Sequence, residues 1–147
     1  MKHSIRPEVD SLRLWSPDSP TLYEVQATLE DKGRQSDSLR TWFGMRSVEV
    51  SNGQVLLNHQ PVYQRLVLDQ GYWPDTLLTP PSDEAIRADV QWIIDLGFNG
   101  VRKHQKIEDP RFYHWCDRLG LLVWGELPSP YEYSQDMLSH SMNDMHR

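Results

Sequence analysis

The sequence of 147 residues is poor in several features on which particular classes of protein depend. It holds one cysteine, Cys116, so an internal disulfide is excluded and nothing calls for an oxidising compartment. No apolar run approaches the length of about 18 residues that a membrane span requires. The N-terminal segment MKHSIRPEVD also lacks the apolar stretch of a signal peptide. We therefore expect a soluble chain without an export signal, and a cytoplasmic location is favoured.

An excess of positive charge is also missing. Lys and Arg together number 15 against 21 Asp and Glu, which gives a net charge of −6, and no basic stripe gathers the cations. Nucleic acid and anionic membranes are therefore not expected partners. The six histidines lack the spacing of zinc ligands, and no G-x-G-x-x-G loop follows an expected strand. The sequence thus predicts neither a metal site nor a nucleotide cofactor.

The most informative stretch runs from Gly97 to Pro130 and has the pattern strand, helix, strand. Asp109 and Pro110 have the chemistry of an N-cap and a first helical residue, and Gly120 suits the left-handed position that ends a helix. The apolar stripe between them has helical spacing: Phe112, Trp115, Cys116 and Leu119. We expect the lone thiol to be buried on this helix.

A second unit of the same kind lies just upstream. Ser82 can cap a helix that has Asp83 and Glu84 in its first turn, and Gly97 follows its end. The expected buried stripe comprises Ile86, Val90, Ile93 and Ile94. With strands expected near 65–69, 98–104 and 121–126, the chain alternates β and α, which is typical of a parallel sheet. A weak helical stripe of Leu138, Met142 and Met145 follows.

The first third has a different pattern. Apolar residues alternate along 23–29 and again along 39–43, with a turn at Asp31-Lys32-Gly33 between them. Asn52-Gly53 is the dipeptide that best accepts positive φ at both centres of a type I′ hairpin. This part of the chain is therefore predicted to be antiparallel β.

The pattern as a whole resembles glycoside hydrolase family two, the group of β-galactosidases, β-glucuronidases and β-mannosidases. The segments that carry the resemblance are LWSPDSPTLY at 14–23, FGMR at 43–46, LNHQPV at 57–62 and GFNGVRKH at 97–104. The resemblance implies the last strands of an immunoglobulin-like sandwich in 1–46 and a connecting hairpin in 47–64. Residues 65–147 would then form the first three β/α units of a (β/α)₈ TIM barrel, about a third of the ~250 residues of a complete barrel.

The resemblance also implies an activity: hydrolysis of a β-linked sugar with retention, β-galactosidase-like, by two glutamates that follow barrel strands four and seven. Neither strand falls within this sequence, so we expect no catalytic residue here and an inactive chain. The expected partners are a carbohydrate substrate and either a second copy of the fragment or the remainder of the enzyme. A non-catalytic carbohydrate-binding or assembly module is the alternative function.

Six residues are candidates for substrate binding, because they stand at the ends of the expected parallel strands, where such folds bind ligands. Arg102 and His104 are two residues apart and should share a side of their strand, facing the barrel interior; a structural ion pair across the barrel mouth is the alternative. The other four are Asp69, Trp73, Trp124 and Glu126.

Three of these candidates have a further interpretation. Glycosidases need two carboxylates, about 5–5.5 Å apart when they retain configuration. Glu126 with Asp69 or Asp75 could form such a pair if the resemblance is set aside, but the resemblance argues against it. Asp69 could alternatively be a carboxylate that bonds loop N–H groups, and Trp73 could be a tryptophan that covers a barrel edge rather than a sugar platform.

Overall fold

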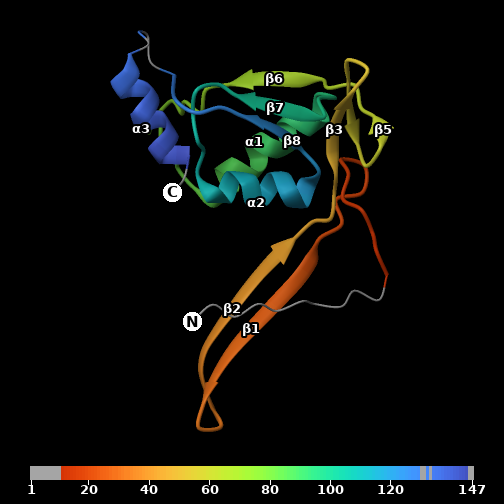
Figure 1. Cartoon of the computed structure of the whole chain (residues 1–147), viewed down its shortest axis with the longest axis vertical. Coiled ribbons are helices and arrows are strands. Elements are labelled where there is room, and N and C mark those ends of the chain that lie inside the picture. The colour runs from red at the N-terminus through yellow and green to blue at the C-terminus, as the bar shows by residue number, and fades with distance from the viewer. Residues whose placement is uncertain (1–10, 130–131, 133, 146–147) are drawn as a thin grey trace. The chain divides into compact units, whose positions relative to one another are not determined.

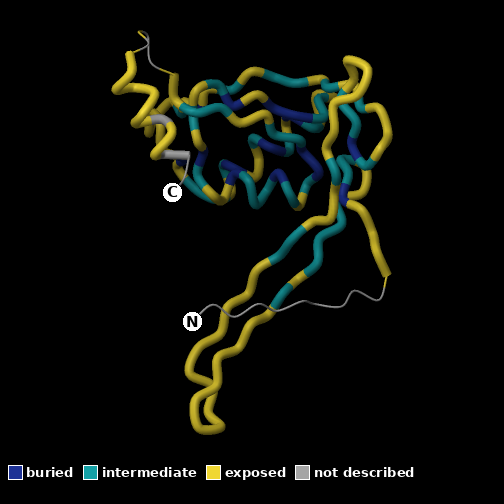
Figure 2. Tube along the Cα trace, in the orientation of Figure 1, coloured by how far each residue is buried: buried dark blue, intermediate teal, exposed yellow. Residues whose placement is uncertain are grey.

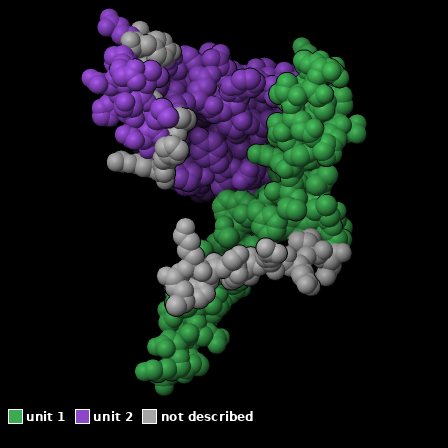
Figure 3. Space-filling model, viewed as in Figure 1, with its two compact units in different colours: residues 1–63 green, residues 64–147 purple. Residues whose placement is uncertain are grey.

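The computed structural model describes residues 11–129, 132 and 134–145, and it divides into two compact units, residues 1–63 and 64–147 (Figure 3). The N-terminal segment MKHSIRPEVD lies outside the described residues. Each unit is described by itself below. None of the helices in the described residues has the length and apolar character needed to cross a membrane.

The first unit begins with a long antiparallel hairpin. Strands β1 (Tyr23–Asp31) and β2 (Arg34–Phe43) pair along their length, and the turn residues Lys32 and Gly33 have φ of 50° and 75°. At the open end of the hairpin the rings of Tyr23 and Phe43 stack with centroids 5.3 Å apart. Most of the hairpin is exposed on both faces (Figure 2).

A second antiparallel sheet completes this unit. It comprises β3 (Val48–Ser51), β4 (Gln54–Leu57) and β5 (Gln60–Pro61) in sequence order. The predicted turn at Asn52-Gly53 is confirmed, with φ of 50° and 74°. Trp15 is 1% exposed, and Asn58 ties it to the sheet by donating from Nδ2 to its carbonyl at 3.0 Å. The antiparallel character predicted for the first part of the chain is therefore confirmed.

The second unit contains a three-stranded parallel sheet in the order β6 (Leu66–Asp69), β7 (Gly100–Lys103), β8 (Leu122–Gly125). The helices α1 (Asp83–Asp95) and α2 (Pro110–Leu119) lie on one face of it (Figure 1). The three parallel strands are confirmed, although each is shorter than predicted. A third helix, α3 (Gln135–Met145), includes the weak apolar stripe, of which the side chain of Met145 is not described.

The helix ends follow the predicted chemistry. The Ser82 hydroxyl accepts from the Ala85 N–H at 3.1 Å, and the Asp109 carboxylate accepts from the Arg111 N–H at 2.9 Å. Gly120 ends α2 with φ of 86°. Because each cap satisfies backbone groups that have no partner within the helix, these residues fix where the helices begin and end.

The two faces of the parallel sheet have different surroundings. Val67, Val101 and Val123 face α1 and α2 and contribute to a core with these buried members: Ile86, Val90, Ile93, Val101, Phe112, Cys116 and Leu121. Cys116 is buried as predicted, and burial raises the pKa of its thiol, which disfavours the reactive thiolate. On the other face, Leu68 and Trp124 are 56% and 52% exposed. Within the described residues the sheet therefore has a helix-covered side and an open side.

Candidate functional site

Charged and polar side chains gather where the three parallel strands end, and strand alternation divides them between the two sides of the sheet. In register, Leu68 lies beside Arg102 and Trp124 on the open side, and the next position pairs Asp69 with Lys103 on the helix-covered side. The side of the sheet on which a residue lies therefore decides which group it joins.

Lys103 is the centre of the group on the helix-covered side. It is 2% exposed, forms an ion pair with Asp69, and lies 2.7 Å from Oε2 of Glu108, which is 6% exposed. Its ammonium also stands 4.1 Å from the centroid of the Phe112 ring. Burial by itself disfavours the ammonium, but the contacts with the two carboxylates outweigh it and raise the pKa of Lys103.

Glu108 and Lys106 join this group from the loop after β7. Burial alone would raise the pKa of Glu108, but its contacts with Lys103, the Asp109 N–H and Lys106 lower it. Lys106 lies 3.0 Å from Oε1 of Glu108 and donates to the carbonyls of Gly71 at 3.1 Å and Leu78 at 3.0 Å. The loop after β6 and the loop after β7 are thus held together by buried charge.

Asp69 takes part in this fastening and does not face the open side. Its Oδ1 accepts from the Gly71 N–H at 2.6 Å, and its Oδ2 accepts from Lys103. The geometry corresponds to the alternative interpretation, a carboxylate bonded within the loop. Asp69 has the same parity as Val67, which puts it on the helix-covered side of the sheet, and its role in substrate binding stays a prediction. It also cannot form a close pair with Glu126, which lies on the open side.

Trp73 lies on the helix-covered side as well. It is partly buried and packs against the core below the sheet. With Trp92 and Asp89 of α1 it lines a cavity of about 380 Å³ beside β6. Burial and the nearby Asp69 carboxylate raise the pKa of Asp89. The packing of Trp73 corresponds to the interpretation of a tryptophan that covers a sheet edge.

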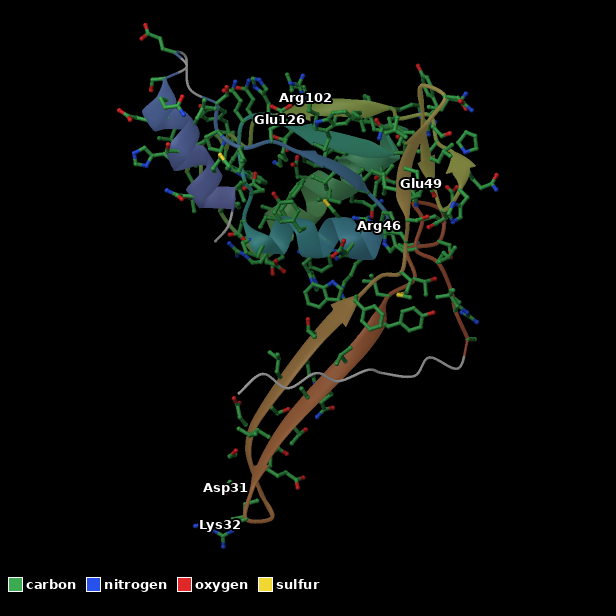
Figure 4. All side chains as sticks on the ribbon, viewed as in Figure 1. Asp31, Lys32, Arg46, Glu49, Arg102 and Glu126 are labelled. Atoms are coloured by element: carbon green, nitrogen blue, oxygen red, sulfur yellow. The ribbon has the colours of Figure 1, made fainter. Side chains whose placement is uncertain are left out.

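Arg102 and Glu126 form the group on the open side. Nε of Arg102 lies 2.5 Å from Oε1 of Glu126, and the two side chains lie together at the end of the sheet (Figure 4). Oε2 of Glu126 accepts from the Gln105 N–H at 3.2 Å. The hydrogen bond from Arg102 is the main reason that the pKa of Glu126 is lowered. Trp124 is the register partner of Arg102 and places an exposed indole on the same side.

His104 follows the last residue of β7 and continues the backbone hydrogen bonding between β6 and β7 by one residue. Its N–H donates to the Asp69 carbonyl at 2.9 Å, and its Nδ1 lies 3.0 Å from Nε2 of Gln70. His104 and Gln70 line a cavity of about 610 Å³ with Tyr72 and Gln105 among its other walls. Four of the six predicted residues, namely Arg102, His104, Trp124 and Glu126, are therefore brought to the open side at the carboxyl ends of the strands.

Sequence reasoning missed Lys103, Glu108 and Gln70. For Lys103 a signal existed, because a lysine in phase with Val101 and out of phase with Arg102 must face the helices and needs carboxylate partners there. Gln70 could have been found by the same parity from Leu68. Glu108 lies in a loop, and only the tertiary structure brings it to Lys103.

Comparison with known proteins shows that the chain is similar to parts of several glycosidases. Residues 2–46 match the family model of the glycosyl hydrolases family 2. A β-galactosidase of Pectobacterium atrosepticum is 32% identical over 98% of this chain, which spans 13% of that protein. An FMN-binding β-glucuronidase from Facaelibacterium prausnitzii L2-6 superposes with a TM-score of 0.81 and a sequence identity of 30%. The match covers 92% of this chain and 21% of that protein. A β-glycosidase from Bacteroides vulgatus superposes with a TM-score of 0.77 and a sequence identity of 25%. The match covers 90% of this chain and 18% of that protein. The predicted resemblance is confirmed.

Proposed function

We propose, from this relation to glycosyl hydrolases family 2, that the chain is a section of a retaining β-glycosidase of the β-galactosidase type. In this proposal residues 1–46 end an immunoglobulin-like sandwich, 47–64 form a connecting hairpin, and 65–147 begin a (β/α)₈ barrel. The sequence of parallel strands with crossover helices supports the last assignment. The small fraction of each relative that the chain spans supports the idea of a section.

The observation that carries the proposal is the group on the open side at the carboxyl ends of β7 and β8. Barrel enzymes bind their substrates at this end of the strands. Arg102 offers a fixed cation and Glu126 a carboxylate for sugar hydroxyls. The exposed indole of Trp124 suits the C–H face of a sugar ring. In this role the Arg102–Glu126 pair binds a β-linked sugar and takes no part in cleaving the glycosidic bond.

Catalysis in this proposal belongs to two glutamates outside residues 1–147. Positioning groups replace neither a nucleophile nor a proton donor, so the chain alone should not turn over substrate. We expect purified 1–147 to leave chromogenic β-galactosides and β-glucuronides intact, and the whole gene product to hydrolyse at least one of them. Hydrolysis by 1–147 that disappears in Glu126→Gln would overturn the assignment of the catalytic groups.

Binding of sugar can be measured separately by titrating the intrinsic tryptophan fluorescence of the chain. Weak saturation that is lost in Trp124→Ala and kept in Trp92→Ala, a substitution on the surface of α1, supports the open side as the substrate wall. Saturation lost only in Trp92→Ala would place binding on the helix-covered side and contradict the proposal.

The open side also supports the expectation that the fragment associates with itself or with the remainder of the enzyme. Within the described residues β6 and β8 are the outer strands of the sheet, and Leu68 and Trp124 are exposed on the side without helices. Unpaired strand edges next to exposed apolar groups favour association.

A further inference from the structure

Gln70 and His104 are a cross-strand pair on the open side whose geometry restricts the chemistry of the imidazole. Nε2 of Gln70 lies 3.0 Å from Nδ1 of His104. The pair is fixed by its covalent neighbours, because the His104 N–H donates to the Asp69 carbonyl and the Asp69 carboxylate binds Lys103 on the other side. Neither residue can move along the sheet without breaking these bonds.

The identity of the two atoms decides where the imidazole proton lies. An amide nitrogen only donates hydrogen bonds, so a ring nitrogen that faces it must accept and therefore has no proton. In a neutral imidazole the proton is then on Nε2. We propose that Gln70 is a positioning residue that holds His104 in the Nε2–H tautomer, so that the ring presents a donor to its ligand.

The other groups around the ring are compatible with this tautomer. Glu126 lies at the end of β8, where its carboxylate forms an ion pair with Arg102. Tyr72 and Lys106 line the same cavity from the two loops. Among the described residues, Gln70 is the side chain with a hydrogen bond to the His104 ring, at 3.0 Å.

A consequence for the ligand rests on the proposed function. An N–H at Nε2 recognises an acceptor, so the sugar group that meets His104 is a hydroxyl oxygen or a carboxylate oxygen and not a donor such as an ammonium. A glutamate at position 70 would reverse this preference, because a carboxylate accepts from an Nδ1–H.

The tautomer can be measured directly by long-range ¹H–¹⁵N correlation of the histidine rings in the ¹⁵N-labelled full chain. His104→Gln identifies the His104 signals. At about pH 8 we expect a protonated Nε2 and an unprotonated Nδ1. In Gln70→Leu the ¹⁵N chemical shifts of both ring nitrogens should move towards the average of the two neutral tautomers. In Gln70→Glu the proton should move to Nδ1.

Gln91→Leu is the matched control, since within the described part of the chain the Gln91 side chain bonds its own helix neighbour Asp95, and this substitution should leave the His104 signals unchanged. An Nδ1–H tautomer in the unmodified chain, or a tautomer that does not respond to Gln70→Leu, overturns the proposal. No sugar is present in this experiment, so its failure is distinct from a failure of the whole gene product to hydrolyse glycosides.

Discussion

Replacing Lys103 by methionine tests whether the buried charges on the helix-covered side hold the second unit together. Methionine keeps most of the side-chain volume and the contact with Phe112 but removes the cation. Asp69 and Glu108 would then share a buried site without the ammonium between them. The substitution therefore separates the charge of Lys103 from its packing.

The expected loss is large relative to the stability of the unit. Removing one partner of a buried ion pair costs about 3–5 kcal/mol. At roughly 0.05–0.15 kcal/mol per residue, a unit of this size is stable by about 4–13 kcal/mol. Lys103→Met should therefore remove a large part of the free energy of unfolding of the second unit. Lys106→Met is the graded comparison, because Glu108 keeps Lys103, and it should cost about 1–3 kcal/mol.

Urea unfolding followed by helical circular dichroism suits this comparison, since the described helices all lie in residues 64–147. With an m-value of about 2 kcal/mol/M, Lys103→Met should lower the midpoint by about 2 M. Adding Asp69→Asn and Glu108→Gln should restore much of the loss, because no unpaired charge then stays buried. A midpoint for Lys103→Met that is no lower than that for Lys106→Met would refute the reasoning.

The same network predicts the dependence of stability on pH. The folded pKa of Glu108 is lowered, so its contribution is complete above the ordinary value of 4.5 and is lost as the pH falls through the folded value. The folded pKa of Lys103 is raised, so its contribution is complete below 10.5 and is lost as the pH rises through the folded value. Acid and alkali should both lower the urea midpoint, and Lys103→Met should abolish the alkaline loss.

Three further predictions follow from single features of the second unit. The folded pKa of Asp89 is raised, so Asp89→Asn should raise the urea midpoint at neutral pH, and the gain should vanish below the ordinary value of 3.8. Gly71→Ala should cost about 1–3 kcal/mol in the same assay, since φ is 68° and the new Cβ would lie 2.5 Å from Glu108 Oε2. Light scattering should detect oligomers of the chain; a heat-stable monomer would contradict self-association.

Local chemistry made much of this fold predictable from the sequence. Asp109-Pro110 and Gly120 mark the two ends of α2, and Asn52-Gly53 marks a hairpin, because each depends on backbone conformations and caps that involve only neighbouring residues. Strand alternation likewise predicted that Arg102 and His104 share one side of their strand. These features need no knowledge of distant contacts.

The candidate site was less predictable, because it depends on which side of the sheet is covered. Asp69 became a candidate for substrate binding from its place at a strand end, although its parity with Val67 puts it with the helices. Trp73 lies in a loop, where no period applies, and its contact with the core is tertiary. A residue at the end of a strand is thus predicted to lie near the candidate site. Whether its side chain joins the group on the open side depends on its position in the alternation along the strand.

The two sides are nevertheless coupled through the backbone, and this decides which substitutions can test the proposed function. Asp69 and Gln70 are consecutive, as are Lys103 and His104, so the ion pair on one side sets the register of the amide–imidazole pair on the other. A change at Lys103 must therefore disturb both the fold and the ligand side. Arg102 is exposed and its ion pair is with Glu126 on the open side, so Arg102→Gln should weaken sugar binding in the whole enzyme while the urea midpoint of the second unit stays almost unchanged. A loss of stability in Arg102→Gln as large as that in Lys103→Met would mean that the open-side pair is part of the scaffold and not of the substrate wall.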